Sequence, residues 1–284
     1  MTKSAELAEL IDGFILAAGQ GTRMGPLSLA LPKPAWTLNG KALLTLAAED
    51  MARAGLGRLA CNAHHLASRL EAAVAGSGLE VFTELELLGS AGGLRHVRHR
   101  AADPLAVFNG DILAEVPWAA FLEAHRARRA QLSWLLVPHP GGPWNPVWLS
   151  PEGRILPPGE TGEGPYHFWG PALWGPEALA LLPDTGPADT KLHVLPRLER
   201  ALGIVVAPFP CLEIGTPDAL IAAAARHAPQ AEGRLPGCYV HPTATPAGQL
   251  RRCVLGPGAA PHPAVTDQDA FWYEEEGYQV RLAL

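Results

Sequence analysis

Two glycines and two basic residues near the start of the chain could together hold a phosphorylated ligand. Residues 16–24 read Leu-Ala-Ala-Gly-Gln-Gly-Thr-Arg-Met, and a Pro-Lys-Pro tripeptide follows at 32–34. At the two glycines the backbone can approach a ligand without interference from a Cβ atom. Successive N–H groups in such a turn form a concavity that binds anions, and Arg23 and Lys33 add fixed positive charge. The segment therefore predicts a phosphate-binding loop.

The first half of the chain must position this loop, and it alternates between strand-like and helix-like segments. The expected strands are 14–16, 58–62, 79–82 and 105–108, the expected helices are 40–54 and 66–75, and a third helical segment follows 89–93. Such alternation is typical of an α/β fold with a largely parallel sheet. Ligands of these sheets bind beyond the carboxyl ends of the strands. Because the glycine-rich loop and Asp111 both follow strands, we expect them to share one crevice.

The second half of the chain differs from the first in its composition. Residues 138–176 are rich in proline, glycine and tryptophan, which makes them too broken for long helices. The expected elements are short antiparallel strands at 147–149 and 166–173, a helix at 192–202, a strand at 204–207, an edge strand at 211–214 and an alanine-rich helix at 217–227.

A linker at 229–237 separates two expected domains, residues 1–228 and 236–284. In the second domain, apolar residues recur between glycines and prolines at Val240, Ala244, Ala247, Leu250, Val254 and Ala259. This pattern indicates about two or three coils of a truncated left-handed β-helix, and an irregular tail is the alternative. So few coils are not stable alone, so we expect them to pack on the main domain or on another subunit.

Composition excludes several classes of function. Of the 284 residues, 48% are hydrophobic and 18% are charged, which is typical of a globular protein. A net charge of −6 without a long basic tract argues against binding to nucleic acid. No segment has the pattern of a signal peptide or a membrane span, so we expect a cytoplasmic protein with no membrane partner. The four cysteines lack metal-site spacing and are expected to be buried thiols.

The loop at 16–24, with Pro26-Leu-Ser28 and the tripeptide at 32–34, resembles the signature of the sugar-1-phosphate nucleotidylyltransferases. Residues 62–66, Asn-Ala-His-His-Leu, are similar to the mannose-1-phosphate guanylyltransferase-like and N-acetylmuramate-1-phosphate uridylyltransferase-like branch. The resemblance covers residues 13–225 in five ordered blocks. It implies a Rossmann-like catalytic domain that transfers a nucleotidyl group from GTP or UTP to a hexose or amino-sugar 1-phosphate and releases pyrophosphate.

On the nucleotide side, residues 84–93, Glu-Leu-Glu-Leu-Leu-Gly-Ser-Ala-Gly-Gly, resemble the family segment that lies against the base and ribose. The resemblance implies that Arg23 holds the leaving phosphates and that Lys33 bridges the α-phosphate and the incoming phosphate. With Asp111, these two are the predicted catalytic residues. The predicted nucleotide-binding residues are Leu16, Ala17, Ala18, Gly19, Gly21, Thr22, Arg23, Lys33, Glu86, Gly89, Ser90, Ala91 and Gly92.

The metal site is also implied by the resemblance, with Mg²⁺ as the cofactor. Asn109-Gly110-Asp111 resembles the family's N-G-D tripeptide, whose aspartate binds the metal. Residues 212–220, Leu-Glu-Ile-Gly-Thr-Pro-Asp-Ala-Leu, are similar to a family segment that supplies a second aspartate, and here Glu213 stands in its place. The predicted ligands are therefore Asp111 and Glu213. Because glutamate is longer, we expect the local strand to retreat or a water molecule to bridge.

The sugar side departs further from the family pattern, because the segment 140–175 contains no E-K-P tripeptide. The predicted sugar-phosphate-binding residues are Asn109, Asn145, Gly170 and Lys191. Lys191 is the candidate for the positive charge that the lysine of an E-K-P tripeptide would supply. The alternative is that Lys191 is a solvated surface residue. His64 and His65 are adjacent and cannot easily share one ion, so we expect them to cap the loop and orient the base pocket.

Of two other classes of function, one fits the sequence and one does not. Glu213 in place of an aspartate and the smaller number of basic residues in the site also fit a catalytically weakened regulatory or nucleotide-sugar-binding subunit. A dinucleotide-dependent oxidoreductase does not fit, because the glycines do not follow G-x-G-x-x-G. The sequence leaves the base and the sugar open, and the short tail points to a homodimer.

Overall fold

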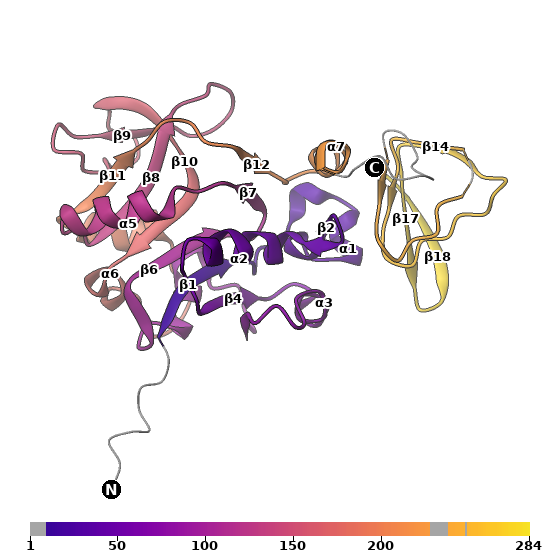
Figure 1. The fold of residues 1–284 in the computed structure, drawn as a ribbon, viewed down its shortest axis with the longest axis horizontal. Helices are drawn as coiled ribbons and strands as arrows, with labels where there is room; N and C mark the ends of the chain where they lie inside the picture. Colours follow the sequence, from indigo (N-terminus) through magenta and orange to yellow (C-terminus); the bar gives the residue numbers. More distant parts are fainter. Residues whose placement is uncertain (1–9, 228–237, 248) are drawn as a thin grey trace, which may run out of the picture.

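The computed structural model describes residues 10–227, 238–247 and 249–284. The first range contains an eight-stranded sheet with the order β11-β8-β10-β6-β1-β4-β5, to which β9 is added by pairing with β10 (Figure 1). Its strands are β1 (Ile11–Leu16), β4 (Leu59–Ala63), β5 (Glu80–Thr83), β6 (Ala101–Asn109), β8 (Leu132–Pro138), β9 (Val147–Leu149), β10 (Glu163–Trp174) and β11 (Ala201–Val205). In this sheet β10 pairs antiparallel with β6, β8 and β9, and all other pairs are parallel. The predicted α/β class with a mixed, mostly parallel sheet is confirmed.

Helices cover both faces of this sheet. On one face, α2 (Leu43–Arg53) and α5 (Trp118–Ala127) pack against a core that includes Ile15, Phe108 and Leu135 (Figure 1). The other helical elements are α1 (Leu27–Ala30), α3 (Ala67–Ala73), α4 (Gly89–Gly92), α6 (Pro176–Ala180), α7 (Pro217–His227) and the short turns η1 (Thr22–Met24), η2 (Lys33–Ala35), η3 (Gly93–His96), η4 (Thr190–Val194) and η5 (Leu195–Arg197). The elements α6, η3 and η4 contribute to the core on the opposite face. No helix in the described ranges has the length and apolar content needed to cross a bilayer.

The carboxyl ends of the parallel strands meet at one edge. Leu16, the last residue of β1, lies opposite Asn109, the last residue of β6, and the Gly110 N–H donates to the Leu16 carbonyl at 2.9 Å. Just beyond this point, β7 (Ile112–Ala114) pairs antiparallel with β12 (Cys211–Glu213). The chain thereby returns to this edge about a hundred residues after leaving it.

Most elements expected in residues 14–227 are confirmed, and the helix expected at 192–202 is wrong in its second half. There, η4 and η5 end at Arg197, and residues 201–205 form β11, which pairs parallel with β8. Pro196 explains the difference, because it lacks an N–H and clashes with the preceding helical turn. The strand expected at 204–207 accordingly begins at Ala201.

The described residues from Cys238 onward, called the C-terminal module here, form stacked coils. The strands β13 (Tyr239–Val240), β15 (Val254–Leu255) and β17 (Ala270–Glu275) pair in parallel, as do β14 (Gln249–Arg251) and β16 (Thr266–Gln268), and β18 (Tyr278–Ala283) returns antiparallel to β17. Leu250, Leu255 and Ala259 lie in its buried interior. The coiled arrangement agrees with a β-helix-like tail. The linker expected at 229–237 lies outside the described residues, and the two-domain division stays a prediction.

All four cysteines are free thiols. Cys61, Cys238 and Cys253 are buried as expected, and Cys211 is half-buried. Burial raises the pKa of Cys61 and of Cys211 to about 12, so neither is a thiolate near neutral pH.

Candidate functional site

A cavity of about 310 Å³ opens at the carboxyl edge of the sheet. It is lined by Leu16, Ala17, Ala18, Gly19, Gly21, Lys33, Pro34, Asn62, Leu87, Gly89, Ser90, Asn109 and Asp111. The cavity thus brings together the glycine-rich loop, the segment around Gly89 and the N-G-D tripeptide, which are far apart in the sequence. This confirms the expected common crevice for the loop and Asp111.

The turn of the loop brings Lys33 to the cavity. Gly21 has a φ of 63°, which is unfavourable for residues with a side chain. A Cβ atom on Gly21 would lie 3.3 Å from the Lys33 Cβ, so a larger residue at position 21 would crowd Lys33. Lys33 begins η2, and Pro32 and Pro34 restrict the backbone on both sides of it.

Both basic residues of the loop are paired with the predicted metal ligands. The Lys33 ammonium pairs with the Asp111 carboxylate, and these side chains are only 14% and 18% exposed. The Arg23 guanidinium pairs with the Glu213 carboxylate, with Arg23 61% exposed. The β7–β12 ladder joins the two pairs, because the Ile214 N–H donates to the Asp111 carbonyl at 3.0 Å. Two cations and two carboxylates therefore meet at one edge of the sheet, and each cation is paired with one carboxylate.

A buried pair of polar side chains connects the loop to the segment around Gly89. The Asn62 side-chain oxygen accepts from the Ala17 N–H at 2.7 Å, and its amide nitrogen donates to Glu84 Oε1 at 2.7 Å. The other Glu84 oxygen accepts from the Leu88 N–H at 3.1 Å. Asn62 and Glu84 are 2% and 4% exposed, so the two bonds of Asn62 lie away from water, whereas the bond from Leu88 is part-buried. Neither residue is among the predicted site residues, although a polar residue near the end of a buried strand is a usable signal.

The segment around Gly89 also rests on residues 188–190. The N–H groups of Ala91 and Gly92 both donate to the Ala188 carbonyl, at 2.9 and 3.2 Å. The Ser90 hydroxyl donates to Asp189 Oδ2 at 3.0 Å and accepts from the Thr190 N–H at 3.0 Å. Of the predicted nucleotide-binding residues, Thr22, Arg23, Glu86, Ala91 and Gly92 do not line the cavity, and Glu86 is exposed.

The predicted sugar-phosphate residues fall into two groups. Asn109 lines the smaller cavity, and a Cβ atom on Gly170, whose φ is 111°, would lie 3.0 Å from the Asn109 amide nitrogen. Asn145 and Lys191 instead line a second cavity of about 620 Å³. Its wall also contains Trp134, and the Lys191 ammonium lies 5.7 Å from the centre of that indole ring. Ser90 lines the smaller cavity and contacts Thr190, and the next residue, Lys191, lines the second cavity. The wall that contains Lys191 therefore lies next to the smaller cavity.

The adjacent histidines make separate contacts. His64 Nδ1 lies 3.0 Å from the Glu84 carbonyl oxygen, whereas His65 Nε2 lies 2.7 Å from the Ser28 carbonyl oxygen. Within the described ranges, no cluster of three or more His, Cys, Asp and Glu side chains is arranged to hold a metal ion. Mg²⁺ typically needs only one or two protein carboxylates when substrate phosphates complete its coordination. Asp111 and Glu213 fit that smaller donor set.

The chain is similar to several known proteins. Residues 13–161 match the family model described as a MobA-like NTP transferase domain. A mannose-1-phosphate guanylyltransferase of Mycobacterium tuberculosis is 33% identical over 133 residues, which are 45% of this chain and 37% of that protein. The chain therefore spans well under half of this relative.

A second relative is covered more fully. The N-acetylmuramate alpha-1-phosphate uridylyltransferase of Neisseria meningitidis is 30% identical over 177 residues, which are 59% of this chain and 76% of that protein. Among solved structures, HddC from Yersinia pseudotuberculosis, complexed with GMP-PN, superimposes with a TM-score of 0.65 and 21% identity, over 76% of this chain and 99% of that one. That likeness concerns the fold.

Proposed function

Because the chain belongs to the family of MobA-like NTP transferase domains, we propose that it transfers a nucleotidyl group from a nucleoside triphosphate to a sugar 1-phosphate and releases pyrophosphate. The observation that carries this proposal is the meeting of Arg23, Lys33, Asp111 and Glu213 at one edge of the sheet, with Lys33 and Asp111 in the lining of the smaller cavity. Two basic side chains can bind a triphosphate, and two carboxylates can bind a divalent cation. The reaction needs both the basic side chains and the metal, because one negatively charged phosphate attacks another.

The triphosphate is expected on the glycine-rich loop, whose N–H groups and basic side chains attract anions. The base is expected against the segment around Gly89, which the Asn62–Glu84 pair holds in place relative to the loop. We therefore expect backbone groups near Gly89 to form hydrogen bonds with the edge of the base. Such short polar contacts are what allow a small pocket to discriminate between bases.

Substrate binding requires the two ion pairs to exchange partners. In the present structure each cation neutralises one carboxylate. When a triphosphate enters, Arg23 turns to the leaving phosphates and Lys33 to the α-phosphate, which frees Asp111 and Glu213. A divalent metal held by these carboxylates would supply positive charge that screens the repulsion between the two phosphates. Exposed ion pairs contribute little stability, so the Arg23–Glu213 pair is easily exchanged.

The chemical step needs no nucleophile from the protein. An oxygen of the sugar phosphate attacks the α-phosphorus and forms the new P–O bond, while the bond to the β-phosphate oxygen breaks in line and pyrophosphate leaves with its electron pair. Lys33 contacts both reacting phosphates and lowers the charge that builds up between them. Positioning and electrostatic stabilisation thus provide the rate acceleration.

The second cavity is the proposed site of the sugar ring. Its aromatic wall suits the apolar face of a sugar ring, and Asn145, Arg154 and Glu160 supply polar contacts around it. Lys191 would direct the phosphate toward the smaller cavity. The names of the two relatives indicate guanylyl and uridylyl transfer, so we propose GTP or UTP as the donor and a hexose or amino-sugar 1-phosphate as the acceptor. Mg²⁺ as the metal, the homodimer and the cytoplasmic location stay predictions.

A screen of pyrophosphate release tests this function. Four nucleoside triphosphates are combined with a panel of sugar 1-phosphates in the presence of Mg²⁺. We expect release that requires both substrates and is restricted to one or two pairs. Tight nucleotide-sugar binding with no release from any pair would contradict the proposal and favour a regulatory, non-catalytic subunit.

A further inference from the structure

The turn that carries Lys33 continues directly into a buried tryptophan. Trp36 ends η2, where its N–H donates to the Lys33 carbonyl at 3.3 Å. Its side chain is fully buried. A single helical turn has no stability of its own, so its position depends on the packing of this ring. Whatever surrounds Trp36 therefore sets where the Lys33 backbone lies.

The C-terminal module supplies two of the rings that surround Trp36. The Tyr239 ring lies 5.4 Å from the Trp36 ring and the Phe271 ring lies 5.9 Å from it, both in edge-to-face geometry. Tyr239 is 2% exposed, and Phe271 is fully buried. Phe271 in turn stacks on Tyr273 with a centroid distance of 4.9 Å. These aromatic contacts are favourable beyond the burial of area and fix the relative orientation of the rings.

Tyr239 also holds the next residue through its hydroxyl group. The Thr37 N–H donates to the Tyr239 hydroxyl oxygen at 3.2 Å, and the Thr37 hydroxyl lies 2.9 Å from the same oxygen. Burial raises the pKa of Tyr239 to about 12, so the hydroxyl stays neutral at physiological pH. One tyrosine of the module thus contacts both residues that follow the lysine turn.

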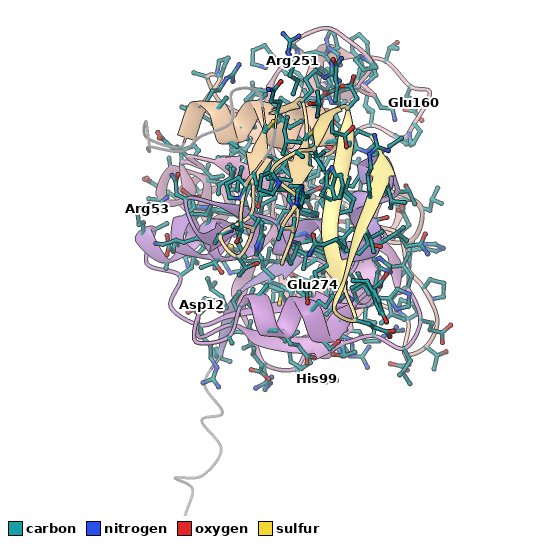
Figure 2. All side chains as sticks on the ribbon, turned by 90° about the vertical axis from the view of Figure 1, so that its right-hand side faces the viewer. Asp12, Arg53, His99, Glu160, Arg251 and Glu274 are labelled. Atoms are coloured by element: carbon teal, nitrogen blue, oxygen red, sulfur yellow. The ribbon has the colours of Figure 1, made fainter. Side chains whose placement is uncertain are left out.

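The module contacts the loop at a second place. The helix α1, which lies between Arg23 and Lys33, packs against β17 (Figure 1). Arg69 donates to the carbonyls of Leu29 and Ala30 at the end of α1 and lies 4.0 Å from Glu275 of β17. Figure 2 views the molecule from the side of the module and shows the β17–β18 hairpin, with Glu274 labelled, in front of the elements of the first described range.

We propose that the C-terminal module is a brace that positions Lys33, with Tyr239 and Phe271 acting as positioning residues through Trp36. This inference rests on the proposed function, because it assigns Lys33 to the phosphates. None of the residues that line the smaller cavity belongs to the module, so we expect its effect on chemistry to pass through the backbone of residues 33–37. By reciprocity, a triphosphate bound to Lys33 should strengthen the docking of the module.

The test uses the full chain with Tyr239→Phe, which keeps the ring but removes the hydroxyl bonds to Thr37. Amide hydrogen exchange of residues 33–37 reports the brace without requiring activity. Steady-state kinetics with the active substrate pair report its consequence. The matched control is Tyr278→Phe, because Tyr278 belongs to the same module and is 76% exposed. Trp272→Phe, which removes an indole bonded to Asp267 inside the module, controls for general loosening of the coils.

We expect faster exchange at residues 33–37 and an approximately tenfold lower kcat for Tyr239→Phe, since small displacements of a catalytic group cost this much or more. The KM values should change less than kcat, and both control variants should keep the wild-type kcat. Faster exchange with an unchanged kcat, or the same kcat loss in Trp272→Phe, would overturn the positioning role. Unchanged exchange would overturn the brace itself. Absence of any pyrophosphate release from the wild type would count against the proposed function, and the exchange result would then decide the brace alone.

Discussion

Arg23 and Glu213 form an ion pair across 190 positions of sequence, and this pair closes the glycine-rich loop onto β12. It occupies both side chains. Lys33 and Asp111 form the matching pair deeper in the site. The four groups are therefore already assembled, and substrate binding needs an exchange of partners rather than a rearrangement of the fold.

The charge of Glu213 should matter for the metal requirement. Glu213→Gln keeps an acceptor for Arg23 but loses the charge that attracts a divalent cation. We expect the Mg²⁺ concentration for half-maximal pyrophosphate release to rise about tenfold, as for other weakened metal sites. Glu213→Asp, which keeps the carboxylate on a shorter side chain, should need no more Mg²⁺ than the wild type. Exposed Glu115, next to β7, supplies the control variant Glu115→Gln. An unchanged metal requirement in Glu213→Gln would remove Glu213 from the proposed ligands.

The Asn62–Glu84 pair should support both stability and nucleotide binding. Asn62→Ala leaves the buried Ala17 N–H and Glu84 Oε1 without their partners. We expect a loss of about 2 kcal/mol in the free energy of unfolding, measured with urea, because buried groups without hydrogen bonds are costly. The KM for the nucleotide should also rise, since the loop and the segment around Gly89 are no longer tied together. Glu123→Gln, an exposed change on α5, serves as the control. Wild-type stability and KM in Asn62→Ala would argue against this coupling.

Lys191 should act on the acceptor and not on the donor. Removing its charge in Lys191→Ala should raise the KM for the sugar 1-phosphate about tenfold and leave the KM for the nucleotide unchanged, as expected for the loss of one charged contact. Lys41→Ala, at an exposed lysine paired with Glu49, is the matched control. If both lysine variants behave like the wild type, Lys191 is a solvated surface residue.

Acid should destabilise the protein through His125. Burial lowers the pKa of His125 to about 4, and its Nδ1 lies 2.8 Å from the Ser133 hydroxyl. The unfolded chain binds a proton near the ordinary pKa of about 6.5, whereas the folded chain does not until about 4. The stability contributed by the neutral imidazole is therefore complete above pH 6.5 and is lost as the pH falls toward 4, by up to about 3 kcal/mol. His125→Gln should flatten this part of the curve of unfolding free energy against pH. An equally steep curve in the variant would assign the acid sensitivity to other groups.

Local sequence patterns predicted much of this fold and part of its site. The loop around Gly21 and the strand before Asp111 were accessible because short apolar runs ending at glycines identify buried strands and the turns that follow them. The pairing of β7 with β12 was not predicted. Strand pairing between distant segments depends on packing that no short window contains.

The parts that sequence reasoning missed are long-range contacts. Nothing local shows that Asn62 bonds to Ala17 or that Trp36 packs on Tyr239, because each contact joins elements that tertiary folding alone brings together. The helix expected at 192–202 ends early for a local reason, because Pro196 interrupts the helical hydrogen bonding. The division of the sugar-phosphate residues between two cavities also required the positions of β8 and β10.

The central claim is that Lys33 and Asp111 act on phosphates at one site. The most direct measurement is kcat for pyrophosphate release by Lys33→Ala and Asp111→Ala, compared with the wild type on its active substrate pair and accompanied by circular dichroism. The account predicts native spectra and rates lower by about a thousandfold, because each variant removes a charge that stabilises the transition state. Near-normal pyrophosphate release by either folded variant would contradict it.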